Sequence, residues 1–440
     1  MQEAGPRLLT TGFDADAAGS AAYELARELF PLPRSLTGDG VRETLRAVGE
    51  VLPIEVTEVP TGTPAFDWKV PREWNVSAAW IADEHGRRLV DYAASNLHLV
   101  GYSRAVRETL RGAELDKHLH SLPDEPDRIP YRTAYWADTW GFCVSERQRE
   151  LIEPDASYEV VIDATLDDGS LTYGEAVLPG ETDEEVLLST YICHPSLAND
   201  NVSGIAVLAM LGRHLSERPL LRTHRLLFSP GTIGPLVWLS RNLGGLDRIH
   251  AGLVVACAGD AGPARYKRSR RGDTVADRAA AHVLARSRSD AVVEDFVPWG
   301  GDERQFCSPG FDLPVGVLTR TPHGLFPEYH TSADDLDLIS AASLGDSLAI
   351  ALEILEVVER DRTYVSRNPY GEPQLGRRGL YREVSAGVPR DDEQFQRALL
   401  WVLNQADGTR TLLEVADHGA LPFSVVAAAA DALVEAGLLE

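Results

Sequence analysis

Short apolar runs alternate with longer segments of helical periodicity between residues 156 and 360, and this alternation constrains the fold most strongly. The strand-like runs cover 158–166, 174–180, 185–192, 224–230, 251–259 and 313–319; the helix-like segments cover 203–217, 235–243, 275–287 and 340–361. This order is typical of an α/β domain with a doubly wound, mostly parallel sheet. Ligands of such domains bind beyond the carboxyl ends of the strands, so we expect a site in the segments that follow these runs.

The regions flanking this alternation differ in pattern and indicate two further domains. Residues 17–53 have the periodicity of two helices, and we assign them with residues 150–362 to one catalytic domain. Residues 54–149 contain short alternating strands broken by Pro, Gly and Asp, which predicts an inserted β-rich domain. Residues 366–440 contain three helical segments after a linker rich in Gly, Pro and Arg, which predicts a small winged-helix-like domain.

Aromatic residues are frequent in the predicted β-rich insert, among them Trp68, Trp74, Trp80, Tyr135, Trp136 and Trp140. Aromatic side chains fill the cores of small sheets, and they also form the walls of ligand pockets. Both alternatives remain open for each of these residues, and we take Trp140 as a candidate for the substrate-facing wall.

The charge of the chain limits its partners. A net charge of −25 disfavours nucleic-acid binding, which depends on Lys and Arg at the phosphates, and disfavours attachment to an anionic membrane. The last helix of the winged-helix region offers no basic residue, so we expect this domain to serve packing or homo-oligomer formation. The four cysteines form no CxxC pair, and the chain has neither a signal-like start nor a long apolar span. We therefore expect a cytoplasmic protein.

Two motifs carry most of the functional information. The segment Tyr-Ile-Cys-His-Pro-Ser-Leu-Ala-Asn-Asp-Asn-Val-Ser-Gly places His194 and Asp200 in a polar loop between a strand and a helix. The segment Pro-Glu-Tyr-His-Thr-Ser-Ala-Asp places His330 in a second loop. Imidazole and carboxylate groups on loops beside buried strands are the ligands that zinc takes at catalytic sites. The two motifs together predict a metallohydrolase site, although Asp200 could instead cap the helix that follows it.

These motifs, with Tyr-Lys-Arg-Ser-Arg-Arg-Gly-Asp (266–273) and Asp-Glu-Arg-Gln-Phe-Cys-Ser-Pro-Gly-Phe-Asp (302–312), resemble a bacterial family of aminopeptidase-like domain proteins of unknown function. Its members have an inserted β-rich domain and a C-terminal winged helix, so the resemblance covers nearly the whole chain. More distantly, the motifs are similar to the clan of di-zinc aminopeptidases and glutaminyl cyclases, which implies a zinc-exopeptidase-like catalytic domain. The resemblance implies that His194, Asp200 and His330 bind metal.

A further ligand is expected after the next strand of such a domain. Asp260 is the best match to the carboxylate that the clan has there. Cys257 is its rival, because a thiolate also suits zinc.

One departure from the clan pattern bears on the mechanism. The aminopeptidases have a Glu-Glu pair, general base and metal ligand, where this chain has Gly231 and Thr232. Loss of a positioned general base costs about 10²- to 10⁴-fold in rate. The usual two-zinc mechanism is therefore in doubt, and we expect one zinc ion rather than two. Glu303 and Glu328 are the nearest substitute catalytic carboxylates, although Glu303 beside Arg304 could instead form an internal ion pair.

The substrate site is expected around the same motifs. Lys267, Arg268 and Arg271 follow Asp260 in the chain and could clamp a substrate carboxylate, or lie on a solvated loop. Tyr191, at the end of the strand before His194, is a further candidate contact.

Three functions remain open. The first is a metal-dependent aminopeptidase-like hydrolase of a peptide-like or amide substrate in a biosynthetic pathway. The second is a single-zinc enzyme that does not hydrolyse, such as a cyclase or acyl transferase. The third is an inactive ligand-binding or assembly protein. The absence of a carboxylate at Gly231 favours the last two, whereas His194, Asp200 and His330 favour the first two.

Overall fold

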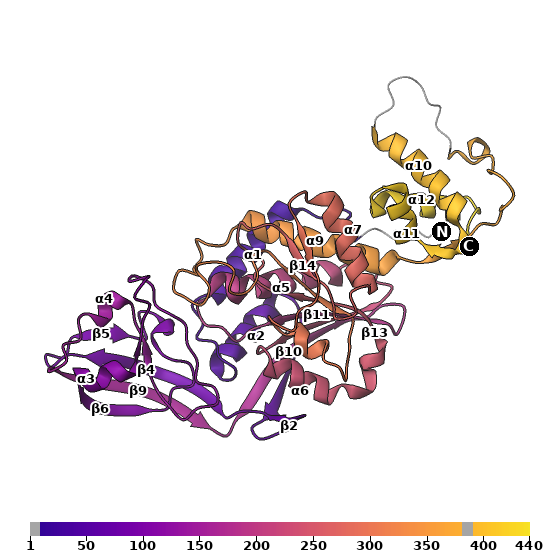
Figure 1. Cartoon of the computed structure of the whole chain (residues 1–440). Helices are drawn as coiled ribbons and strands as arrows, with labels where there is room; N and C mark the ends of the chain where they lie inside the picture. Colours follow the sequence, from indigo (N-terminus) through magenta and orange to yellow (C-terminus); the bar gives the residue numbers. More distant parts are fainter. Residues whose placement is uncertain (1–8, 381–389) are drawn as a thin grey trace.

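The computed structural model describes residues 9–380 and 390–440 of the chain (Figure 1). Its centre is an eight-stranded sheet with the order β1-β10-β12-β11-β13-β16-β14-β15. These strands are β1 (Glu55–Pro60), β10 (Ser170–Leu178), β12 (Thr223–Ser229), β11 (Glu185–Tyr191), β13 (Ile249–Val255), β16 (Val315–Thr319), β14 (Arg265–Lys267) and β15 (Val292–Glu294). The four central strands β12, β11, β13 and β16 run parallel, whereas β1, β10 and β14 pair antiparallel with their neighbours toward the centre. The sheet is therefore mixed, with a parallel centre.

Helices cover both faces of this sheet, as the alternation of strands and helices predicts. One layer contains α1 (Ala15–Leu29), α2 (Asp39–Val51), α5 (Gly204–Ser216), α7 (Val275–Ser287) and α9 (Ala341–Arg360). The opposite face is covered by α6 (Ile233–Arg241), the short α8 (Glu303–Phe306) and part of the insert. In β11, Val186 and Leu188 join the first core and Leu187 joins the second, because successive side chains of a strand point to opposite faces. Every residue of β11 is buried, including the polar Glu185, Ser189 and Thr190.

The inserted domain is built on a separate four-stranded antiparallel sheet with the order β5-β4-β9-β6. Its strands are β4 (Glu73–Ala82), β5 (Arg88–Asp91), β6 (Val106–Arg111) and β9 (Ser157–Asp167). Shorter elements are β2 (Pro64–Ala65), β3 (Trp68–Lys69), β7 (Leu119–His120), β8 (Phe142–Cys143), α3 (Gly112–Leu115) and α4 (Glu146–Arg149).

The borders of this insert differ from the predicted 54–149. Strand β1 lies at the edge of the central sheet, whereas β9, assigned from sequence to the catalytic domain, pairs with β4 and β6 of the insert. Both strands show the alternation of a half-buried strand, and that pattern does not say which sheet a strand joins.

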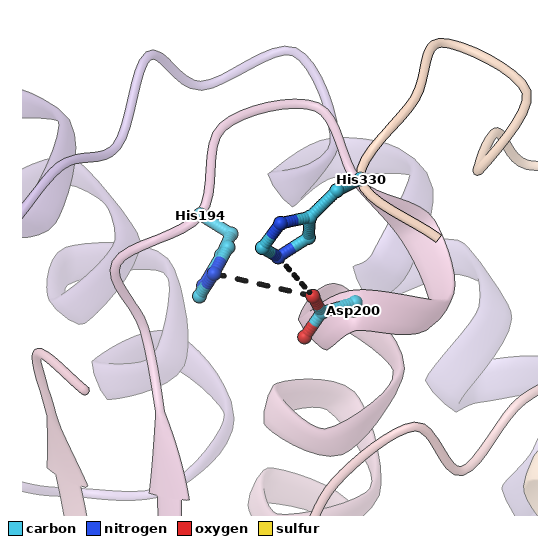
Figure 2. Close-up of side chains that lie close together, drawn as sticks. All are labelled: His194, Asp200 and His330. Atoms are coloured by element: carbon cyan, nitrogen blue, oxygen red, sulfur yellow. Dashed lines mark ion pairs between the residues drawn. The ribbon is translucent and has the colours of Figure 1, made fainter. Parts of the chain in front are cut away.

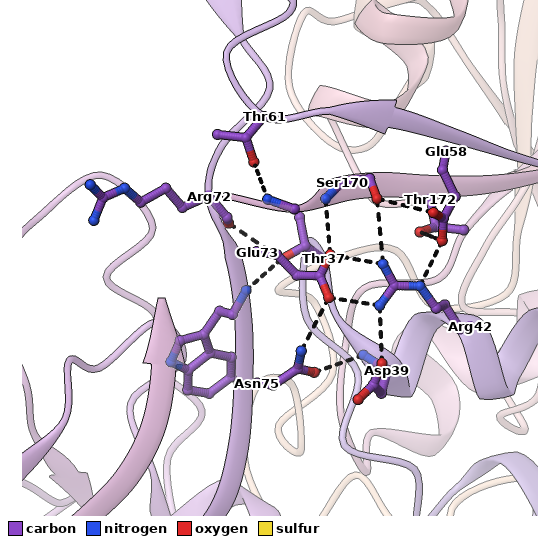
Figure 3. A network of polar contacts seen from close by, with 12 residues as sticks. Thr37, Asp39, Arg42, Glu58, Thr61, Arg72, Glu73, Asn75, Ser170 and Thr172 are labelled. Atoms are coloured by element: carbon purple, nitrogen blue, oxygen red, sulfur yellow. Dashed lines mark hydrogen bonds and ion pairs between the residues drawn. The ribbon is translucent and has the colours of Figure 1, made fainter. Parts of the chain in front are cut away.

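A polar network connects the insert to the central sheet (Figure 3). Arg42 of α2 donates two hydrogen bonds to Glu73 at the start of β4, at 2.7 and 2.8 Å, and pairs with Glu58 of β1 at 2.7 Å. Glu73 also accepts a hydrogen bond from the backbone of Ser170 in β10. One cluster of ion pairs, partly buried and partly exposed, therefore connects elements of the two sheets.

The C-terminal domain contains α10 (Arg390–Gln405), α11 (Leu412–Gly419) and α12 (Phe423–Glu435), with β17 (Thr363–Val365) pairing with β18 (Asp407–Thr411). It contacts the catalytic domain directly. Arg360 of α9 pairs with Asp431 at 2.6 Å, and His282 of α7 pairs with Asp417 at 2.7 Å. Within the described ranges, no single helix is long and apolar enough to cross a membrane. Together α11 and α12 pass that test by length and composition, with a bend of 120° between them.

Candidate metal centre

Three side chains from two loops meet beyond the carboxyl ends of the parallel strands (Figure 2). His194 follows β11, Asp200 lies in the turn that leads into α5, and His330 lies in the long loop between β16 and α9. Oδ2 of Asp200 is 3.0 Å from Nε2 of His330 and 3.9 Å from Nε2 of His194. All three donor atoms lie within 4.8 Å of one another. Two donors at zinc–ligand distances of about 2.0–2.2 Å can be separated by at most about 4 Å, so small side-chain rotations suffice to hold one ion.

The hydrogen bonding of these atoms fits a cation. Among the described residues, Oδ2 of Asp200 and Nε2 of His330 have no partner in hydrogen-bond geometry, although they lie 3.0 Å apart. Asp200 is fully buried. A buried polar atom without a partner costs free energy, and a cation between these two atoms would satisfy both. We conclude that this donor set suits zinc.

The shifted pKa values of His194 and Asp200 favour the binding of a cation. Burial lowers the pKa of His194 to about 4, so its imidazole is neutral at pH 7, as metal ligation requires. Burial alone would raise the pKa of Asp200, but the neighbouring imidazoles of His194, His330 and His323 outweigh it and hold the carboxyl below its ordinary range. Asp200 therefore carries its negative charge inside the protein.

A second donor group shares Asp200. It consists of Asp200, Cys257 at the end of β13, and His323 in the loop after β16. Here the donor atoms already have a partner, the hydroxyl of Tyr191, which contacts Oδ1 of Asp200 and lies 2.7 Å from Nε2 of His323. Burial also raises the pKa of the Cys257 thiol well above its ordinary value. This second group is thus less ready for a metal than the first.

Asp260 is not part of either group. Its Oδ1 accepts hydrogen bonds from Gly262 N and Thr321 Oγ1, and its Oδ2 accepts from Asn199 Nδ2 and Thr321 N. The carboxyl group of Asp260, a predicted metal ligand, instead connects the segments that carry Asn199 and Thr321. Cys257, its predicted rival, belongs to the second donor group. The reason is that Cys257 directly follows the buried end of β13, whereas Asp260 lies three residues further along, after the chain has turned away.

Asp334 supports Asp200 from behind. Its two oxygens accept hydrogen bonds from the backbone N–H groups of Asn199 and Asp200 at 2.6 and 3.0 Å. Burial, followed by the nearby charge of Asp200, raises the pKa of Asp334 to about 8. The Asp200–Asn201 peptide bond is cis.

The three donors of the first group border a cavity of about 230 Å³. Its lining residues are Leu36, Tyr131, Thr133, Tyr135, Tyr191, Cys193, His194, Asp200, Gly231, Thr232, Gly300, Gly301, Asp302, His323, Tyr329 and His330. The insert supplies Tyr131 and Tyr135, and Tyr131 N donates to the backbone oxygen of His330 at 2.7 Å. An aromatic wall from the insert therefore faces the metal ligands, although Trp140 is not part of it.

Non-glycine residues with positive φ gather at this centre. Thr232, Cys257 and His330 have φ of 60°, 44° and 55°. Such backbone conformations cost free energy and cluster at functional sites.

The other predicted site residues lie at different distances from the cavity. Tyr191 lines it. Glu303 is fully buried beside it and pairs with Lys267 at 2.5 Å, which supports the ion-pair alternative with Lys267 in place of Arg304. Glu328 does not line the cavity.

Three predicted substrate contacts point elsewhere. Arg268 donates to the backbone oxygen of Gly272, and Arg271 pairs with Asp312 at 3.2 Å on the half-exposed surface. Trp140 is buried inside the insert with its ring stacked on His118 at 3.7 Å. These side chains serve local structure, because each finds its partner on its own segment or a neighbouring one.

Sequence reasoning missed His323 and Asp302. Both follow features that could have identified them: His323 lies four residues after the end of strand β16, and Asp302 follows the Gly300-Gly301 pair. Both residues line the cavity only because segments distant in the chain fold together there, and no local sequence pattern reveals such a contact.

Known proteins match this architecture. The model of a family described as a domain of unknown function (DUF4910) matches residues 23–361, and a winged helix-turn-helix model matches residues 362–440. A protein of Clostridium acetobutylicum, named provisionally as a polysaccharide biosynthesis protein with an aminopeptidase-like domain, is 45% identical over 423 residues, 96% of each chain.

Solved structures agree with this assignment. A crystal structure of a provisionally assigned peptidase from C. acetobutylicum has a TM-score of 0.91 at 44% identity and covers 97% of both chains. The zinc aminopeptidase BSAP from Bacillus subtilis has a TM-score of 0.57 at 13% identity, over 79% of this chain and 95% of its own, which shows a shared fold. These matches confirm the family resemblance and the aminopeptidase-like α/β fold. The chain belongs to the DUF4910 family and carries a C-terminal winged-helix domain.

Proposed function

We propose that this protein is a zinc-dependent hydrolase that cleaves an amide bond in a peptide-like or small amide substrate within a biosynthetic pathway. The observation that carries the proposal is the convergence of His194, Asp200 and His330, with two unpartnered donor atoms, at the wall of a cavity of about 230 Å³. The name of the C. acetobutylicum relative supports a biosynthetic setting.

Different residues of the chain would bind the metal and the substrate in such a reaction. His194, Asp200 and His330 would hold the zinc ion, which would polarise the amide carbonyl and lower the pKa of bound water. Tyr131, Tyr135 and Tyr329 would pack against the substrate and exclude bulk water. A cavity of about 230 Å³ is smaller than most sites for drug-sized ligands, so it suits one terminal residue or a small acyl group.

One ion fits this site better than two. Two donors of the first group, Oδ2 of Asp200 and Nε2 of His330, have no hydrogen-bond partner among the described residues, whereas the Tyr191 hydroxyl bonds to Asp200 and His323 of the second group. A second ion would have to displace that hydroxyl and deprotonate the Cys257 thiol.

The proposal is tested with the zinc-loaded full chain on a panel of amino-acid p-nitroanilides, dipeptides and N-acetyl amides. We expect slow turnover of at least one class, loss of that turnover with a chelator, and recovery with zinc. His194→Ala should abolish it, and Arg271→Ala, on the surface, should leave it unchanged. Bound zinc without cleavage of any class, or cleavage that survives chelation, would contradict the proposal.

A second function is favoured by one observation, the absence of a carboxylate at Gly231. A zinc enzyme that transfers the acyl group to an amine inside the substrate or on a second molecule does not have to activate water. Reaction in H₂¹⁸O separates the two functions, because hydrolysis puts one labelled oxygen into the acid product and transfer puts in none.

A further inference from the structure

Asp302 is a buried carboxylate at the cavity wall. Its side chain is 1% exposed, and it lines the cavity together with the donors of the metal centre. Its Oδ1 accepts a hydrogen bond of 2.7 Å from Thr232 N, whereas its Oδ2 has no hydrogen-bond partner among the described residues. One oxygen therefore fixes the group, and the other is a buried acceptor without a partner.

Glycines surround Asp302 at the cavity wall. Gly231, Gly300 and Gly301 line the same cavity, so none of them brings a side chain beside Asp302. A Cβ at Gly231 would lie 3.1 Å from the sulfur of Cys193 and 3.4 Å from Cβ of Tyr191, so the space beside Gly231 is narrow.

A short chain of contacts connects Asp302 to the metal centre. Thr232, whose N–H binds Asp302, follows Gly231, whose own N–H donates to Sγ of Cys193 at 3.1 Å. That sulfur lies 3.4 Å from Nδ1 of His194. Asp302 thus lies against the segment at which the clan has its general base.

We propose that Asp302 is the proton acceptor of this site and stands in for the carboxylate that is absent at Gly231. The inference rests on the hydrolytic function proposed above. The Asp302 carboxylate takes one proton from a water molecule while the water oxygen forms a bond to the amide carbon. The resulting carboxylic acid returns that proton to the amide nitrogen as the carbon–nitrogen bond breaks. Water is thereby added across the amide, and nothing is oxidised or reduced.

The charge environment suits this role. Burial, with the nearby Glu303 carboxylate, raises the pKa of Asp302 to about 7, although the Thr232 N–H and Arg304 oppose the shift. The Cys193 thiol also faces this group, and Lys267 neutralises Glu303 on its far side. A proton acceptor is most effective when its pKa lies near the working pH.

Glu303 is the direct competitor for this role. Its Oε1 pairs with Lys267 at 2.5 Å, and although its Oε2 lacks a hydrogen-bond partner among the described residues, the residue is not part of the cavity lining. Glu303→Gln is therefore a matched comparison for Asp302→Asn, because the two acids are neighbours in the chain.

The first experiment compares Asp302→Asn with Asp312→Asn, which removes a carboxylate from the same loop but outside the cavity. The probe is the p-nitroanilide cleaved fastest by the zinc-loaded wild type. We expect at least a 100-fold loss of kcat in Asp302→Asn with zinc still bound, and no loss in Asp312→Asn.

The wild-type rate should rise with pH through about 7, and this acid limb should be absent from the residual activity of Asp302→Asn. Asp302→Glu should recover part of the rate.

The second experiment does not depend on activity. A buried Asp with a raised pKa keeps its proton in the folded state and loses it in the unfolded state between pH 4 and 7. The folding constant of the wild type relative to Asp302→Asn should therefore fall about tenfold per pH unit across this range. Urea unfolding at several pH values in EDTA measures it.

The outcomes separate the two proposals. A zinc-dependent wild type with an unimpaired Asp302→Asn overturns the role of Asp302 and leaves the hydrolase standing, as does a loss confined to Glu303→Gln. Parallel pH dependence of the two folding constants also overturns it. A zinc-loaded wild type that cleaves no amide overturns the hydrolase and, with it, this inference.

Discussion

At the scale of single residues, the centre is defined by atoms that lack a partner. Nε2 of His330 and Oδ2 of Asp200 are 3.0 Å apart without hydrogen-bond geometry. Asp260 also has a carboxyl group, but it accepts hydrogen bonds on both oxygens and has nothing left to offer an ion. Asp200 and Asp260 are the same residue type, but their hydrogen bonds distinguish a metal ligand from a carboxyl group that only connects loops.

This distinction leads to a prediction about zinc binding. His330→Ala removes one of three donors, and we expect it to weaken zinc binding by more than about 100-fold, the upper range for losing only an outer hydrogen-bond partner of a ligand. Asp260→Asn exchanges one accepting oxygen for an amide nitrogen and so loses some of these hydrogen bonds, but it removes no donor of the centre and should still bind one zinc. Competition with a chromophoric chelator measures both affinities. If Asp260→Asn loses zinc while His330→Ala retains it, the centre lies at Asp260.

At the scale of elements, the site depends on how two sheets are joined. The insert carries Tyr131, which binds the backbone of the His330 loop, while the Arg42 cluster anchors the start of β4 to α2 and β10 (Figure 3). The arrangement of the insert therefore sets the position of the cavity wall.

Removing Arg42 tests this junction. Arg42→Ala breaks two hydrogen bonds to Glu73, and we expect a loss of about 1–3 kcal/mol in the free energy of unfolding at pH 7. The hydrogen bonds of Arg42 lower the pKa of Glu73 to about 2, so its contribution is complete above about pH 4.5 and is lost as the pH falls through about 2. Urea unfolding at several pH values measures it.

A matched control lies on the same helix. Arg46→Ala removes an exposed pair with Glu50 and should change stability by at most about 0.5 kcal/mol. Equal effects of the two substitutions would show that the cluster does not anchor the insert.

At the scale of the whole molecule, the winged helix is held by the catalytic domain. Asp431 of α12 pairs with Arg360 of α9, and the N–H of Phe423 donates to His282 of α7. The helix that a DNA-binding winged helix would place in the major groove is thus attached to a domain of the same, acidic chain. Homo-oligomer formation through this domain remains our proposal.

We expect no binding of DNA duplexes at physiological salt. The chain has a net charge of −25, and α12 contains no Lys or Arg to contact phosphates. Fluorescence anisotropy with a labelled duplex of random sequence tests this up to about 10 μM protein. A saturable signal that weakens steeply with salt would contradict the expectation, since that dependence marks phosphate contacts.

Local sequence determined the elements and the loops that carry the site. The runs at 185–192 and 203–217 correspond to β11 and α5, because a fully buried strand and a helix have different periods of apolar residues. The carboxyl ends of parallel strands lie at one edge of a sheet, so His194, Asp200 and His330 could be assigned to one site before their distances were known.

Tertiary structure decided what depends on contacts between distant segments. Which sheet β1 and β9 join follows from their partners, and these cannot be derived from the strands alone. Asp302 and Glu303 are neighbours in the chain, but successive residues at the start of a helix point in directions about 100° apart. One carboxylate therefore lines the cavity and the other faces Lys267, and only the folded loop determines which.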